Sequence, residues 1–199
     1  MLQILGTAKK ALRDEAAAFI TALGHHESNV AAMVLDQHIR LTVVIDAAPQ
    51  RAGSAASDES SDDLDGNTVV TWNNGTTLID VSVPLLPGDQ GMLPTLLHEL
   101  ILHANVAYIQ HRHAVDQGRV PVYPTTETAI DAAAKQEHAD LPAWLSMIGY
   151  AAALGGAPLM NLAVFDSGTY GMGKRVLEML LIQGTITERQ AADYRKVMG

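Results

Sequence analysis

Hydrophobic positions along the first half of the chain change their period between helical and strand-like spacing. Apolar residues recur at helical spacing over residues 1–23 and again over 27–39, where Ser28 or Asn29 can serve as the N-cap, and this predicts two N-terminal helices. Residues 40–46, "RLTVVID", are rich in β-branched side chains and predict a strand. The pattern therefore combines helices and strands within one segment.

A β-hairpin follows, and it has the clearest local pattern of the chain. The segments "NTVVTW" (residues 67–72) and "TTLIDVSV" (76–83) flank "NNG" (73–75), whose Asn and Gly tolerate the positive φ of a tight reversal. Residues 47–67 precede it with almost no large apolar side chain, and they predict a long loop. The acids of this loop lack the spacing of an EF-hand, so we do not predict a calcium site.

The second half of the chain has helical patterns only. "ETAIDAAAKQEHADL" (127–141) predicts one helix, and residues 141–165 carry no charge but are interrupted by glycines and prolines. We interpret the uncharged stretch as two buried helices rather than a membrane hairpin. The C-terminal 27 residues predict two more helices, separated by Gly184, the second opened by a Thr187–Gln190 capping box.

These elements predict an α+β fold. We expect N-terminal helices, a small and mainly antiparallel sheet within residues 40–83, a motif helix packed on that sheet, and a helical C-terminal half. The expected domains are an α+β domain over 1–120 and a helical subdomain over 121–199 that completes a cleft.

Composition narrows the classes of function. The 199-residue chain is 48% hydrophobic and 18% charged, as expected of a folded protein, and its net charge of -9 with only 13 Lys and Arg argues against nucleic acid. With no cysteine, a metal must be held by His, Asp or Glu. Charges near the N-terminus are unlike a signal peptide, so we expect cytoplasmic synthesis, with export by a specialised system and the oligomeric state left open.

The candidate chemistry lies in "LPTLLHELILHANVAYIQHRH", residues 93–113. His98 and His103 are five apart, one more than in the H-E-x-x-H motif of zinc peptidases. On a regular α-helix this spacing separates two side chains by about 140°, whereas a spacing of four separates them by about 40°. A π-bulge would bring both histidines to one face and leave Glu99 beside them.

Two other interpretations of this helix stay open. Glu99 and His103, four apart, share a face without a bulge and could themselves bind a metal. The segment could instead be a core helix without a ligand, although a buried Glu99 would then need a polar partner. His111 and His113 near its end are expected to be exposed.

The stretch "TTLIDVSVPLLPGDQGMLPTLLHELILHANV" (76–106) resembles the strand-to-active-helix unit of the zincin metallopeptidases, and "LLHEL..HA" resembles the peptidase-like effectors and toxins of bacteria. The resemblance extends to "ETAID", where it implies Glu127 as a third zinc ligand and Asp131 as a group that orients a ligand histidine. An acidic first helical turn is the alternative for these two residues. Glu137 and His138 are the reserve ligands.

The hypothesis that follows is a metal-dependent hydrolase, a zinc peptidase of effector or toxin type that acts on a peptide or protein. His98, His103 and Glu127 would hold Zn²⁺, and Glu99 would be the general base. The alternative is a non-catalytic adaptor or structural protein of a phage or secretion system. Membrane insertion by residues 141–165 is a third hypothesis.

Overall fold

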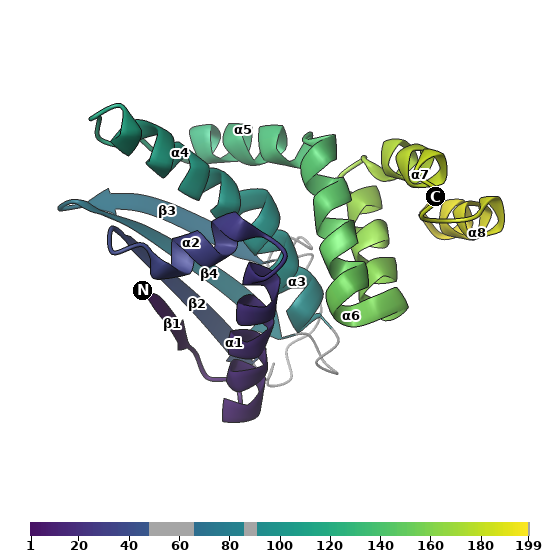
Figure 1. Ribbon diagram of the computed structural model, residues 1–199, viewed down its shortest axis with the longest axis horizontal. Coiled ribbons are helices and arrows are strands. Elements are labelled where there is room, and N and C mark those ends of the chain that lie inside the picture. Colours follow the sequence, from purple (N-terminus) through teal and green to yellow (C-terminus); the bar gives the residue numbers. More distant parts are fainter. Residues whose placement is uncertain (48–65, 86–90, 199) are drawn as a thin grey trace, which may run out of the picture. The chain divides into compact units, whose positions relative to one another are not determined.

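The computed structural model describes residues 1–47, 66–85 and 91–198, and these form two compact units, Met1–Tyr123 and Pro124–Gly199 (Figure 1). Most of the predicted acidic loop lies outside the described residues. The first unit combines a sheet with helices, and the second contains helices. The α+β class and the helical C-terminal half are therefore confirmed, and the predicted cleft stays a prediction.

The sheet of the first unit is mixed rather than mainly antiparallel. Its strands are β1 (Leu2–Leu5), β2 (Ile39–Ala47), β3 (Asn67–Asn73) and β4 (Thr76–Leu85), in the spatial order β1-β2-β4-β3. Both β1 and β4 pair with β2 in parallel, whereas β3 pairs with β4 in the antiparallel direction. The prediction erred because a hairpin is a local pattern, whereas parallel pairs join segments that a crossover separates.

The β3–β4 hairpin is present as predicted. Asn73 pairs with Thr76, and the two residues between them, Asn74 and Gly75, have φ of 46° and 87°. Positive φ at both central positions is the conformation that Asn-Gly tolerates best. The turn places β3 at the edge of the described sheet.

Helices cover one face of this sheet (Figure 1). They are α1 (Lys10–Gly24), α2 (Ser28–Leu35), α3 (Met92–His98), the π-helix η2 (Glu99–Ala104) and α4 (Asn105–Asp116). The motif helix packs on the sheet through α3 and η2, as expected. The first helix begins only at Lys10, because residues 2–5, expected to be helical, pair with β2 instead.

The core of the first unit lies between the sheet and these helices. Alternate residues of β2 and β4 are buried, as are many of the apolar residues of the motif helix and several of α1. The buried side chains include Ile20, Leu23, Leu41, Val43, Ile79, Val81, Leu96, Leu97, Leu100 and Leu102. This core fixes the motif helix against the sheet.

The second unit consists of α5 (Glu127–His138), α6 (Leu141–Thr169), α7 (Gly173–Ile182) and α8 (Glu188–Met198). The predicted capping box opens α8: Gln190 N donates to Thr187 Oγ1, and Thr187 N donates to Gln190 Oε1. Gly184, with φ of 68°, lies between the last two helices as expected.

The uncharged stretch forms most of α6, which is long and apolar enough to cross a membrane by length and composition. Gly156 interrupts it with φ of 61° and ψ of −154°, two residues before Pro158. Each helical segment on either side is shorter than the roughly 20 residues of a membrane-spanning helix. Trp144, Met147, Ile148 and Val164 are buried, although most of the apolar stretch is not.

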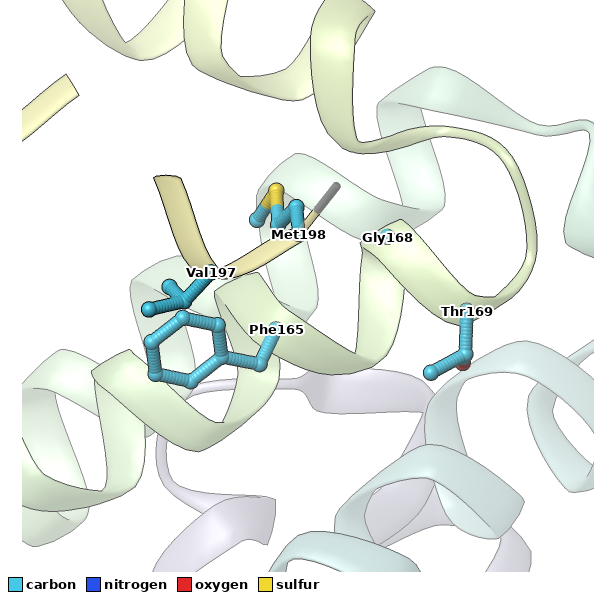
Figure 2. A pocket seen from close by; sticks show the side chains of 5 residues that line it. All are labelled: Phe165, Gly168, Thr169, Val197 and Met198. Carbon is cyan, nitrogen blue, oxygen red and sulfur yellow. The ribbon is translucent and has the colours of Figure 1, made fainter. Parts of the chain in front are cut away.

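A hollow of about 250 Å³ lies in the second unit between the end of α6 and the end of α8 (Figure 2). Its lining consists of Phe165, Gly168, Thr169, Val197 and Met198. None of these residues offers an acid, a base or a strong metal ligand. The candidate chemistry therefore lies elsewhere.

Candidate metal centre

The motif helix contains the π-helical turn that the histidine spacing requires. Residues Glu99–Ala104 form a π-helix between α3 and α4, and the ring centroids of His98 and His103 are 5.3 Å apart. The extra residue of the turn removes the divergence of about 140° expected on an α-helix. Two imidazoles thus lie close together in the first unit, His98 buried and His103 half-buried.

The apolar residues inside the turn explain how the chain accommodates it. Leu100, Ile101 and Leu102 are consecutive, and all three are buried. A helix that is apolar on nearly every side gains from being enclosed, so widening one turn exposes no apolar side chain to water. The helix continues directly into α4 beyond Ala104.

Glu99 has the polar partner that a buried carboxylate needs. Only 3% of Glu99 is exposed, and Thr68 Oγ1 on β3 donates a hydrogen bond of 2.6 Å to its Oε2. Such a bond to a charged acceptor offsets part of the cost of burial. The Glu99 side chain is therefore held against the edge strand.

Gly66, just before β3, leaves the space that this arrangement uses. A Cβ added there would lie 2.7 Å from Glu99 Oε1 and 2.5 Å from Thr95 Cγ2. Both distances are shorter than van der Waals contact, so a larger residue would push on the carboxylate. Gly66 and Thr68 were not among the predicted site residues, although Thr68 is on the same side of β3 as Val70 and Trp72.

The second unit carries the other residues considered as ligands, and their environments differ. Glu127 and Asp131 are exposed on α5, a helix without a buried residue. His138 is the last residue of α5 and is half-buried, with its ring stacked on Tyr170. The roles implied for Glu127 and Asp131 stay predictions.

Three histidines could serve as metal ligands, His98 and His103 in the first unit and His138 in the second. Each contributes one ring nitrogen, and neutral imidazole is a good ligand for zinc and other transition metals. Of the reserve ligands, His138 is one of these candidates. These side chains are compatible with a metal-binding role.

His111 is buried, and the expectation that it is exposed was wrong, whereas His113 is exposed as expected. Only 1% of His111 is accessible, and its Nδ1 lies 2.9 Å from Thr77 Oγ1, which in turn lies 3.1 Å from Tyr123 OH. Tyr123 OH also donates to the carbonyl oxygen of Ala107. This network joins β4, α4 and the segment after α4.

Burial lowers the pKa of His111, because the charged imidazolium loses hydration. Asp36 opposes this shift, while His38 and Arg112 add to it. The neutral form therefore suits this site, and His111 has a structural role in the first unit.

No protein-family model matches the chain, and neither does any curated protein or solved structure. The likeness to zincins therefore rests on the motif and on the order of the elements.

Proposed function

We propose that this protein is a zinc-dependent hydrolase in which His98, His103 and His138 hold the metal and Glu99 is the general base. The observation that carries the proposal is the π-helical turn Glu99–Ala104, which brings the first two imidazoles together. Such turns occur often at functional sites, because they are less favourable than a continuous α-helix.

The set of donors suits catalytic zinc. Sites of this class use three protein ligands and leave a fourth position for water or substrate. Zinc bound in this way acts as a Lewis acid and makes water a nucleophile near neutral pH. Histidine alone supplies the ligands here, consistent with a chain that has no cysteine.

We propose His138 rather than Glu127 as the third ligand. His138 is half-buried, and aromatic neighbours restrain its ring. Glu127 is exposed in the first turn of α5, where its charge also favours the helix dipole. An exposed side chain loses more freedom on binding a metal, so it is the weaker candidate.

Glu99 is suited to the role of base because it follows a ligand directly in the sequence and is held in place. Thr68 donates to one of its oxygens. A carboxylate has about four lone-pair positions, so a single hydrogen bond leaves it able to accept a proton. Its restraint against β3 reduces the movement that would otherwise weaken general-base catalysis.

A peptide or protein is the substrate class that the sheet favours. The strand β3 is the antiparallel edge strand next to the motif helix, and an extended peptide can pair with such an edge. The same order of hairpin and active helix is typical of zincins. An effector or toxin role remains part of this proposal.

The zinc content of the purified protein tests the proposed metal site. Tag-free protein is stripped with chelator, reloaded with zinc, desalted and measured by mass spectrometry. We expect about one zinc per chain in the wild type and, because binding is weaker, a lower zinc content after desalting in His98→Ala, His103→Ala and His138→Ala. The control is His113→Ala, which removes an exposed histidine of α4. Equal zinc in all variants would refute the site.

Hydrolysis of a fluorogenic peptide library tests the proposed activity and the role of Glu99 as the general base. Glu99→Gln keeps the shape of the side chain but removes the base, so we expect zinc to be retained and turnover to fall at least about 100-fold. A zinc-loaded wild type without turnover, or a Glu99→Gln variant as active as the wild type, would contradict the assignment of Glu99.

A further inference from the structure

His138 lies in an aromatic setting built by the second unit. Its ring stacks on Tyr170 with centroids 3.8 Å apart and planes inclined by 25°. The indole of Trp144, which is fully buried, lies 5.8 Å from the Tyr170 ring and 6.4 Å from the His138 ring. Trp144 Nε1 also donates a hydrogen bond of 2.8 Å to the backbone carbonyl oxygen of His138.

These contacts fix both the backbone and the ring of His138. The carbonyl at the end of a helix has no partner within that helix, and here the buried indole supplies one. This bond matters because α5 has no buried residue of its own. The end of α5 is thereby attached to the buried part of α6.

Stacking is compatible with metal binding because the two use different parts of the ring. Tyr170 covers a face of the imidazole, whereas the lone pair that binds a metal lies in the ring plane. The stacked partner therefore limits rotation of the ring without blocking that direction. Aromatic pairs of this kind stabilise the structure by more than the burial of their apolar area alone.

We infer that Tyr170 and Trp144 are positioning residues that orient His138 as a ligand before the metal arrives. This inference rests on the proposed function of the site. A preoriented side chain loses less freedom on binding, so the metal is held more tightly. Loss of the Tyr170 ring should raise the Kd for zinc about tenfold, whereas loss of only its hydroxyl should leave it unchanged.

The experiment is a competitive zinc titration of the full chain against a chromophoric chelator. It compares wild type with Tyr170→Ala and Tyr170→Phe, and circular dichroism checks that each is folded. Should Tyr170→Ala fail to fold, Tyr170→Leu replaces it, since leucine keeps apolar bulk but cannot stack as a planar ring. We expect weaker binding for the variants without the ring, and rescue by phenylalanine.

A double-mutant cycle with His138→Ala separates positioning from a general structural effect. If Tyr170 acts through His138, then Tyr170→Ala should add no further loss of zinc affinity once His138 is absent. An equal loss in both backgrounds would overturn the inference, because it would show that the ring acts on the fold as a whole.

The outcomes also separate this inference from the proposed function. A wild type that binds no zinc, or whose affinity His138→Ala does not change, overturns the ligand set and the inference together. If His138→Ala weakens binding but Tyr170→Ala does not, then the site stands and the positioning role alone is wrong.

Discussion

Replacing Thr68 by valine removes the partner of the buried Glu99 carboxylate and changes little else. Valine has nearly the shape of threonine, so the packing of β3 against the motif helix is kept. The change removes one hydrogen bond to a charged acceptor, the 2.6 Å contact between Thr68 Oγ1 and Glu99 Oε2. Bonds of this kind contribute about 1.5–3 kcal/mol, so we expect the free energy of unfolding to fall by about 2 kcal/mol.

Urea denaturation followed by tryptophan fluorescence measures this change. The chain has two tryptophans, and in a Trp144→Phe background the remaining Trp72, on β3, reports on the first unit. Thr68→Ser keeps the hydroxyl and should retain most of the stability. Thr71→Val alters an exposed threonine of the same strand and should change the stability by less than about 0.5 kcal/mol.

The reasoning would be refuted if Thr68→Val were as stable as Thr71→Val. It would also be refuted if Thr68→Ser were destabilised as much as Thr68→Val, because the effect would then belong to the methyl group and not to the hydroxyl.

Further predictions concern the buried histidine, the glycine beside Glu99 and the capped last helix. Because burial lowers the pKa of His111, the unfolded chain binds more protons than the folded chain below about pH 6.5, so stability should fall as the pH falls from there. The variant His111→Asn keeps a polar group that can bond to Thr77 but does not titrate. Its free energy of unfolding, measured by urea titration at several pH values with a chelator present, should therefore depend less on pH. An unchanged pH dependence would contradict this prediction. Gly66→Ala should displace the Glu99 carboxylate, and so destabilise the first unit by about 1–3 kcal/mol and lower any turnover. Unaltered stability and turnover would argue against the close contact. Thr187→Ala should cost the second unit about 1 kcal/mol, seen in thermal unfolding, while Thr187→Ser should not.

Most of what could be predicted about the fold came from local sequence patterns. The hairpin was predictable because Asn74 and Gly75 suit positive φ and alternation continues on both sides. The strand β1 was missed because four residues are too few to establish a period, and its partner, Leu41–Val44, is remote in sequence. Pairing with β2 decides its conformation.

The part of the site that depends on helix geometry alone was predictable from the sequence. The spacing of His98 and His103 allowed two solutions, and the structure has the π-helical one. The burial of His111 was not predictable, because it depends on Thr77 of β4 and on Tyr123, which the fold alone brings near. The environment of His138 likewise depends on Tyr170, 32 residues further along the chain.

X-ray absorption spectroscopy at the zinc edge tests the central claim most directly. The zinc-loaded wild type should show three imidazole nitrogens at about 2.0–2.1 Å and a fourth light ligand, and His138→Ala should show only two imidazoles. A wild-type spectrum with fewer than three imidazoles, or one that His138→Ala leaves unchanged, would contradict the three-histidine site.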